Sequence, residues 1–389
     1  MLTQAQIEAG YERDQQRRGR PLTDPAQVPA AFEDLTPEWL TGTICAGHPG
    51  AEVLEHRLEP FEEGTTNRTR LRVTYNAAGT AAGLPTRLFC KATQGLANRL
   101  TLGLSGGAEA EVRFYQHVRP LLDLAAPPGV YADFDAETAN SIVILEDIAA
   151  SVTEFCTQNT TIDRDQIQDA LTLLATLHGT GYSNPRLRDQ FDHFISWRQF
   201  FTNIQVFGLK VGSEEGFRRA ADFVPARLYE RQAEIWPATL AAVGHADQLP
   251  HTLTHSDVHL KNWYITDTGA MALSDWQCTS TGHWGRDFGY AIATALTVED
   301  RRAWERDLLA LYLDRLHSAG GPKVDFDDGW LHYRRQLMSA LTWWTITYNP
   351  APGMPDMQPL ETAREFVHRL ATAIDDLDTL DSLAPHLAG

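Results

Sequence analysis

The chain has 389 residues, of which 22% are charged, and its formal net charge is −18 at pH 7. A chain of this length exceeds what one small hydrophobic core organises, so two domains or lobes are expected. Because contacts to nucleic-acid phosphates need a basic surface, the acidic balance excludes a general nucleic-acid-binding protein. The acidic surface favours solubility first, and a cationic substrate second.

The sequence also gives an expectation for the cellular compartment. No apolar run approaches the length of a membrane span, and the polar start of the chain lacks the apolar core of a signal peptide. The four cysteines lie far apart without a CxxC pair, which indicates buried thiols in a reducing compartment. A cytoplasmic monomer or homodimer without membrane or nucleic-acid partners is therefore expected.

Strand patterns dominate the first third of the chain. A short helix precedes them, with Thr36 as its N-cap and Pro37 at its first position. Residues 53–75 then predict two strands joined by a polar turn at Glu62–Asn67, because apolar and polar residues alternate in the second. The elements expected next are a loop of small residues (76–85), a third strand (86–92), a helix (108–122) and a buried strand (141–148).

The remainder of the chain has a mostly helical pattern. Apolar residues at helical spacing between Ile167 and Leu177 predict a helix, with Gly179 as its C-cap. Two short strands, in 253–266 and 270–277, are expected around a turn at Asp267–Gly269, and helices resume from residue 287. The layout is a β-rich first third followed by a helical part that contains one polar hairpin.

This polar hairpin carries side chains suited to phosphoryl transfer. Asp257 precedes Asn262 by five positions, and Asp275 follows on the partner strand. Carboxylate and carboxamide oxygens suit Mg²⁺, which shares its coordination shell with substrate phosphates. Asp257, at the start of the loop, is placed to accept a proton from an attacking hydroxyl. Phosphoryl transfer uses such a set of a positioning carboxylate, an Asn and an Asp.

Phosphoryl transfer also needs a lysine for the nucleotide phosphates and an acid that holds it. Lys91 ends the apolar third strand, where a lysine requires a partner. Glu111, on the packed side of the following helix, is one candidate partner and Glu109 is the other.

Two further segments are candidates for nucleotide contacts. Gly64 and Thr65 lie in the turn between the first two strands, where backbone N–H groups would reach a phosphate. The single glycine makes that turn equally typical of a plain hairpin. Glu146–Ile148 would connect the two lobes and offer backbone groups to the adenine edge.

The order of these residues resembles the aminoglycoside phosphotransferase, choline kinase and ecdysteroid-kinase-like group, small-molecule relatives of protein kinases. Three motifs carry the resemblance: an HxDxxxxN loop at His255–Asn262, an SDW strand at Ser274–Trp276, and GRDFGY at Gly285–Tyr290. The segment EVRFY resembles the helix that bears the partner of the lysine, which favours Glu111. The resemblance extends over roughly residues 36–345, and the LTPEWLT segment most resembles the ecdysteroid-kinase-like branch.

The resemblance implies an α+β, bilobal, protein-kinase-like fold. A lobe with a small antiparallel β-sheet would span residues 1–147, and a larger, mainly helical lobe 148–389, with nucleotide and Mg²⁺ in the cleft between them. The implied activity is transfer of the γ-phosphate of ATP, or of GTP, to the hydroxyl of a small-molecule alcohol. In that reaction Asp257 is the base, Asn262 and Asp275 bind Mg²⁺, and Lys91 contacts the α- and β-phosphates.

The sequence departs from the protein-kinase pattern in two places. Ser256 stands where protein kinases have the HRD arginine, and Trp276–Gln277 replaces the Phe-Gly of DFG. The first departure is normal for the small-molecule branch and implies no activation-loop phosphorylation site. The glycine loop matches poorly, which leaves ATP and GTP both open.

Other candidates have two interpretations each. Lys261 would neutralise the transferred phosphoryl group or would face solvent. His283, Trp284 and Asp287 follow the metal-binding strand and are candidates for contacts with the acceptor. Aromatic residues crowd the helical part and would line a pocket for an apolar or quaternary-ammonium alcohol, or pack the core.

Two alternative functions stay open. Three alternating residues, His255, Asp257 and His259, would share one face of a strand and could bind zinc in a metal-dependent hydrolase. In the kinase interpretation His255 is instead a scaffold that hydrogen-bonds the loop. The other alternative is a catalytically silent nucleotide-binding protein of the same fold. The acceptor itself is not identified by the sequence.

Overall fold

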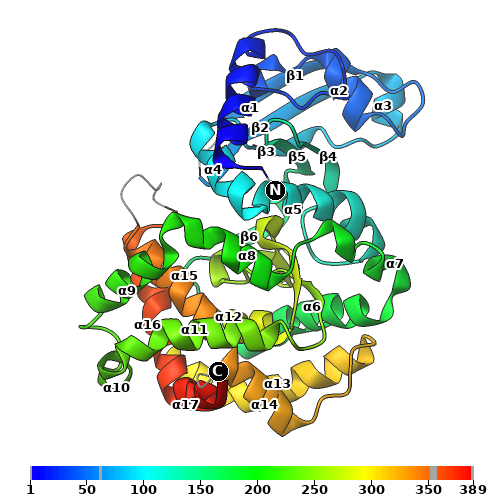
Figure 1. The fold of residues 1–389 in the computed structure, drawn as a ribbon. Helices are drawn as coiled ribbons and strands as arrows, with labels where there is room; N and C mark the ends of the chain where they lie inside the picture. The colour runs from blue at the N-terminus through cyan, green and yellow to red at the C-terminus, as the bar shows by residue number, and fades with distance from the viewer. Residues whose placement is uncertain (1, 61–63, 351–356, 387–389) are drawn as a thin grey trace. The chain divides into compact units, whose positions relative to one another are not determined.

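The computed structural model describes residues 2–60, 64–350 and 357–386, and it divides into two compact units, Met1–Ser151 and Val152–Gly389. The chain is coloured along its length in Figure 1. The turn expected at Glu62–Asn67 begins outside the described residues, which resume at Gly64. Among the described helices, none combines the length and the apolar character needed to cross a membrane.

The first unit is built on a five-stranded antiparallel sheet with the strand order β1-β2-β3-β5-β4. Its strands are β1 Val53–Pro60, β2 Asn67–Tyr75, β3 Arg87–Ala92, β4 Gly129–Asp135 and β5 Asn140–Glu146. The expected alternation in β2 is real, because Leu71, Val73 and Tyr75 are buried on one face. Strand β4 was not anticipated from the sequence.

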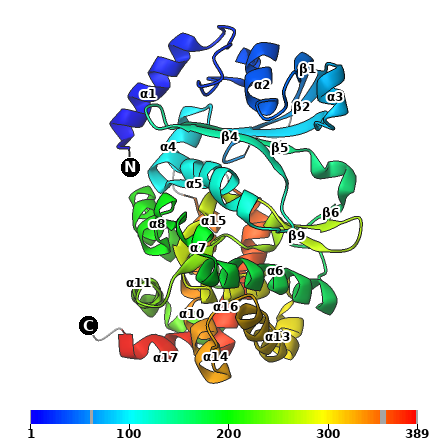
Figure 2. The same cartoon turned by 90° about the vertical axis from the view of Figure 1, so that its right-hand side faces the viewer.

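Helices cover both faces of this sheet: α2 packs on one face and α5 on the other (Figure 2). The face toward α2 is apolar, with Trp39 of α2 against Leu71, Leu88 and Ile144. The helices of this unit are α1 Gln4–Arg17, α2 Pro37–Ile44, α3 Ala77–Ala81, α4 Leu96–Ser105 and α5 Gly107–Arg113. Beyond α5 the chain stays helical, as a π-helix at Phe114–Val118 and a 3₁₀ turn at Arg119–Leu121.

The predictions for the helices of this unit met different outcomes. The Thr36 side chain accepts a hydrogen bond from the Trp39 N–H and caps α2, so that prediction is confirmed. The small-residue loop at 76–85 is wrong, because Asn76 caps a short helix, α3, that the alanines support. Helix α4 was missed, since its N-cap is Gly95, which offers no side chain to cap the helix.

The second unit is mainly helical and holds two small antiparallel sheets, β6-β8-β9 and β10-β7. The strands are β6 Val152–Phe155, β7 Thr252–Thr254, β8 Trp263–Thr266, β9 Met271–Leu273 and β10 Ser280–Gly282. The helices are α6 Arg164–Ser183, α7 Pro185–Arg188, α8 Trp197–Ile204, α9 Leu209–Arg219, α10 Ala226–Glu230, α11 Gln232–Ala246, α12 Gly285–Ala295, α13 Val298–Ser318, α14 Phe326–Arg335, α15 Met338–Tyr348, α16 Leu360–Asp376 and α17 Thr379–Leu383.

The predicted hairpin is present, and its turn lies between β8 and β9 at Asp267–Gly269. Strand β7, which precedes the hairpin, pairs with β10 and not with β8, the next strand in the sequence. The loop Ser256–Asn262 therefore connects strands of two different sheets. The fold class is confirmed: an α+β chain with a small antiparallel sheet in its first unit and a larger, mainly helical second unit.

One helix end was predicted wrongly. Helix α6 runs past Gly179 to Ser183, and its C-cap is Asn184. Gly179 lies inside the helix because α13 packs against it (Figure 1). A Cβ atom at this position would come within 2.5 Å of the Ala319 side chain and 2.7 Å of the Leu316 carbonyl oxygen. A glycine is needed here because α6 and α13 approach each other closely, and the local sequence does not reveal that contact.

Candidate active-site loop and its supports

In the first unit, Lys91 and Glu111 form a buried ion pair. The Lys91 Nζ atom lies 2.6 Å from Glu111 Oε1, and the two side chains are 7% and 4% exposed. Lys91 comes from the end of β3 and Glu111 from α5, so the sheet and the helix on its second face supply one partner each. The competing acid, Glu109, instead pairs with Arg113 one helical turn away at 3.2 Å. The geometry therefore brings Lys91 to Glu111.

The candidate phosphate turn is tied to α4. The carbonyl oxygens of Gly64 and Thr65 accept hydrogen bonds from the Asn98 side chain at 3.2 and 2.8 Å. The Gly64 N–H donates to the Thr66 carbonyl at 3.1 Å. The described part of the turn is therefore hydrogen-bonded to α4.

The candidate connector follows the sheet directly. Glu146 is the last residue of β5 and is exposed, and its N–H donates to the Pro128 carbonyl at 3.0 Å. Ile148 begins a 3₁₀ turn that ends at Ser151, the last residue of the first unit. The backbone of Glu146–Ile148 thus leaves the sheet at the point where the chain enters the second unit.

In the second unit, Asp257 and Asn262 face each other across the loop. The Asn262 Nδ2 atom donates to the Asp257 carbonyl oxygen at 2.7 Å and lies 3.3 Å from the carboxylate Oδ2. A 3₁₀ turn at Leu260–Asn262 folds the loop back and makes this contact possible. Because the amide nitrogen is turned to Asp257, the carboxamide oxygen of Asn262 points to the opposite side.

Asp275 reaches the same end of the β8–β9 hairpin as Asn262. In the hairpin register Trp263 pairs with Leu273, so Asn262 precedes one strand where Asp275 follows the other. Ser274 fixes the junction, because its N–H and its hydroxyl both donate to the Asn262 carbonyl, at 2.8 and 2.9 Å. Asp275 has a left-handed backbone, with φ of 64°. For a residue other than glycine such a backbone costs roughly 1–2 kcal/mol.

The loop backbone rests on a buried carboxylate, Asp287. Its two oxygens accept hydrogen bonds from the N–H groups of His255 and Ser256 at 2.7 and 2.9 Å. The His178 Nε2 atom lies 3.1 Å away as a third partner. Ser256 needs this support, since its backbone is also left-handed with φ of 66°. Burial by itself raises the pKa of Asp287. The hydrogen bond from His178 and the nearby positive charges lower this pKa by more, so the net shift is downward.

The Asp257 carboxylate has further neighbours on α12 and on its own loop. The Tyr290 hydroxyl donates to Asp257 Oδ1 at 3.1 Å, and the Trp344 indole N–H donates to the Tyr290 oxygen at 2.7 Å. The His259 Nε2 atom lies 3.6 Å from Oδ2. Burial raises the pKa of Asp257, while His259 and His255 lower it, and the net shift is downward. The carboxylate is therefore ionised near neutral pH and is 19% exposed.

His255 serves the loop as a scaffold would. Its Nε2 atom lies 2.9 Å from the Ser274 carbonyl oxygen, and its Nδ1 atom accepts the Asp257 N–H at 3.2 Å. Both ring nitrogens are therefore engaged with backbone groups. In the part of the chain that the structure describes, no three histidine, cysteine, aspartate or glutamate side chains gather as a metal-binding group.

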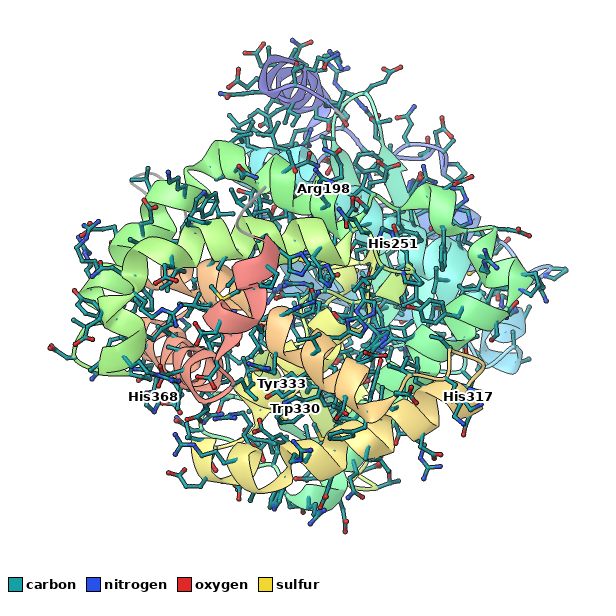
Figure 3. All side chains as sticks on the ribbon, turned by 60° about the horizontal axis from the view of Figure 1, so that its bottom comes forward. Arg198, His251, His317, Trp330, Tyr333 and His368 are labelled. Carbon is teal, nitrogen blue, oxygen red and sulfur yellow. The ribbon has the colours of Figure 1, made fainter. Side chains whose placement is uncertain are left out.

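The other predicted residues lie in different surroundings. Lys261 is half-buried, and burial lowers its pKa against the opposing effect of Glu361. His283 and Trp284 are 5% and 1% exposed. His283 lines a pocket whose rim includes Arg198, labelled in Figure 3.

Several residues of this site were not found from the sequence. Asp287 was predicted as a contact for the acceptor, and its hydrogen bonds to the loop backbone were not expected. Its further partner His178 lies 109 residues away in the chain. Tyr290 was part of a quoted motif without a role, and Trp344 was counted only among the aromatic residues. The hydrogen bonds that connect them join α6, α12 and α15, and no local pattern signals such contacts.

Comparison with known proteins agrees with this architecture. Residues 57–326, well over half of the chain, match the model of the phosphotransferase enzyme family. The chain therefore belongs to the phosphotransferase enzyme family, and the suspected resemblance is confirmed. No curated protein matches the sequence.

Solved structures of low sequence identity are similar to this one. One is a protein of Ralstonia eutropha JMP134, provisionally described as an aminoglycoside phosphotransferase, with a TM-score of 0.51 and 14% identity over 85% of this chain and 93% of that one. Another is the choline kinase LicA from Streptococcus pneumoniae, with a TM-score of 0.45 and 12% identity over 84% of this chain and 94% of that one. The first of these likenesses supports the fold class.

Proposed function

We propose that the protein is a small-molecule kinase that transfers the γ-phosphate of ATP, or of GTP, to the hydroxyl of an alcohol. The observation that carries the proposal is the contact between Asp257 and Asn262 on a loop whose neighbouring strand ends at Asp275. Membership of the phosphotransferase enzyme family supports the same reaction class.

In the proposed reaction Asp257 is the general base. The acceptor oxygen forms a bond to the γ-phosphorus, the bond from that phosphorus to the β,γ-bridging oxygen breaks, and the acceptor proton passes to the Asp257 carboxylate. A carboxylate that is ionised at neutral pH and partly exposed suits this step. Its hydrogen bonds hold it in one orientation, so the acceptor hydroxyl meets a fixed base.

The oxygen atoms near the loop fit a magnesium ion. Asn262 turns its carboxamide oxygen away from Asp257, and Asp275 supplies a carboxylate at the same end of the hairpin. Hard oxygen ligands of this kind, few in number, suit Mg²⁺ that also binds substrate phosphates. When bound there, the ion would neutralise charge on the β- and γ-phosphates.

The nucleotide contacts in this proposal come mainly from the first unit. Lys91, held by Glu111, would bind the α- and β-phosphates as a buried cation. Gly64 and Thr65 would cover the phosphates, and the backbone of Glu146–Ile148 would hydrogen-bond the adenine. From the second unit, Lys261 would add positive charge near the transferred group.

The acceptor is proposed only as a small-molecule alcohol. The net charge of −18 favours a cationic acceptor, and aromatic side chains of the second unit favour one with an apolar surface. Contact of the acceptor with His283, Trp284 or Asp287 stays a prediction. For Asp287 such a contact would compete with the hydrogen bonds that it accepts from the loop.

The first experiment replaces the proposed base. Asp257→Asn should abolish phosphoryl transfer while the dissociation constant for the nucleotide changes little, because the carboxamide cannot take the proton. The measurement is nucleotide consumption over a panel of alcohols, with nucleotide binding followed by calorimetry. Asp267→Asn makes the same chemical change at an exposed turn of the same hairpin and should leave the rate unchanged.

The outcomes separate the open alternatives. Turnover retained by Asp257→Asn would reject the assignment of the base. Nucleotide binding without transfer to any alcohol by the unaltered protein would favour the silent nucleotide-binding alternative. Tightly bound zinc in the purified protein would favour the metal-dependent hydrolase.

A further inference from the structure

The hydrogen bonds around Tyr290 have a fixed direction. The Trp344 indole N–H can only donate, so the Tyr290 oxygen is the acceptor in their 2.7 Å contact. The single hydroxyl proton of Tyr290 then remains for Asp257 Oδ1, which lies 3.1 Å away. An ionised carboxylate can only accept. The chain Trp344 to Tyr290 to Asp257 therefore has one possible order of donors and acceptors.

These three groups are also held rigidly. Tyr290 and Trp344 are 0% and 1% exposed, and the Trp344 ring meets Phe366 edge-on at 4.6 Å between ring centroids. Tyr290 lies one helical turn after Asp287 on α12, and Asp287 holds the backbone beside Asp257. Helix α12 thus fixes both the loop backbone and the orientation of the carboxylate.

The second carboxylate oxygen is approached from the loop itself. Asp257 Oδ2 faces the Asn262 amide at 3.3 Å and His259 at 3.6 Å. The Tyr290 contact is shorter than the Asn262 and His259 contacts. It also comes from a separate element, helix α12. Without it, rotation of the carboxylate about its Cβ–Cγ bond would be limited only by the Asn262 and His259 side chains of the same loop.

We propose that Tyr290 is a positioning residue for phosphoryl transfer: its hydroxyl, directed by Trp344, holds the Asp257 carboxylate in the orientation that receives the acceptor proton. This inference rests on the proposed function, because it requires Asp257 to be the base. Trp344 acts through Tyr290 and does not contact the carboxylate. Trp344 on α15 thereby acts on the reaction through Tyr290 on α12.

The test replaces the hydroxyl and keeps the ring. Tyr290→Phe should lower kcat by roughly 10- to 100-fold, the scale of a misplaced catalytic group, while the KM values for nucleotide and acceptor stay within about twofold. Trp344→Phe should lower kcat less, because the hydroxyl remains but loses its direction. The double variant should be no slower than Tyr290→Phe, since Trp344 acts only through that hydroxyl.

A matched control separates positioning from loss of stability. Tyr333, labelled on α14 in Figure 3, is equally buried, and its hydroxyl donates to Glu305 at 2.9 Å. Tyr333→Phe makes the same chemical change and should leave kcat within about twofold, even where both variants lose similar stability. Urea unfolding of each variant measures that stability.

The outcomes distinguish this inference from the function on which it rests. If Asp257→Asn abolishes transfer while Tyr290→Phe keeps the kcat of the unaltered protein, the positioning role is rejected and the proposed function stands. If Tyr290→Phe and Tyr333→Phe lower kcat equally, the effect is structural and the inference is rejected. If the unaltered protein transfers phosphate to no alcohol, the proposed function and this inference fall together.

Discussion

At the scale of single residues, the ion pair of Lys91 and Glu111 combines a structural and a proposed functional role. Both side chains are almost completely buried, so their ion pair stabilises two charges in the protein interior. The sequence predicted Lys91 from its place at the end of an apolar strand. The choice between two acids needed the resemblance to known kinases, because both candidates lie on the same helix.

Removing one partner of this pair should be costly. We expect Glu111→Ala to lower the free energy of unfolding by about 3–5 kcal/mol, because Lys91 would stay buried without its acid. The double variant Lys91→Met/Glu111→Leu should recover most of that loss. Chemical denaturation measures both, and Glu109→Ala, which removes the partly exposed acid of the same helix, is the control. Equal effects of Glu111→Ala and Glu109→Ala would contradict the prediction.

The loop illustrates what a single sequence reveals about a site. Asp257, Asn262 and Asp275 were recognisable because their spacing is local and their chemistry is specific. Tyr290 was not recognisable, because a tyrosine in an apolar helix is usually part of the core. Its contact with Asp257 arises from the packing of α12 beneath the loop, 33 residues away in the chain.

At the scale of elements, the first helix is attached to its unit by a buried charge. Asp14 of α1 is 1% exposed and lies 2.8 Å from the Arg99 guanidinium of α4, which is 0% exposed. Asn140, at the start of β5, is 3.4 Å from the same carboxylate. The sequence indicated only a polar start of the chain here. The buried acid was hidden because α1 is polar over most of its surface.

Helix α1 should therefore contribute to the stability of the first unit. We expect Asp14→Ala to lower the free energy of unfolding by about 3–5 kcal/mol, because Arg99 would be left as a buried, uncompensated cation. Glu12→Ala removes an exposed acid from the same helix and should change stability by less than about 0.5 kcal/mol. The two variants are compared by urea denaturation, and similar values for both would refute a clamping role for Asp14.

Element boundaries were predictable where the signal is local. The Thr36 cap and the turn at Asp267–Gly269 were found because capping and turn residues act within a few positions. Strand β4 escaped prediction because it is amphipathic only weakly and follows two prolines. The predicted C-cap at Gly179 was wrong because this glycine makes room for α13 and does not end the helix.

At the scale of the whole molecule, buried histidines connect stability to pH. The pKa of His283 is well below its usual value, first because of burial and then because of His332, His178, His245 and His251 nearby. Its ring centroid lies 4.5 Å from that of His332, whose pKa burial also lowers. A histidine with a depressed pKa in the folded state stays neutral there, while the unfolded chain binds a proton below pH 6.5.

The sign of the effect follows from this difference. The stability that the neutral histidine contributes is fully present above pH 6.5 and is lost as the pH falls below that value. We expect His283→Phe to reduce the loss of unfolding free energy between pH 7.5 and pH 5.5 by about 1 kcal/mol. Urea denaturation at the two pH values measures it, with His48→Phe at an exposed position as the control. An unchanged difference in His283→Phe would show that this residue does not titrate on unfolding.

The division of the chain at Ser151 has a consequence for its synthesis on the ribosome. All five strands of the first sheet, its helices and the pairs Lys91–Glu111 and Asp14–Arg99 are encoded before Val152. At about 5–20 residues per second, translation from Val152 through Asn262 at the end of the loop takes roughly 6–22 s, which exceeds the folding time of most small domains. The nascent chain can therefore close its first sheet and bury both ion pairs before the loop that carries Asp257 is complete.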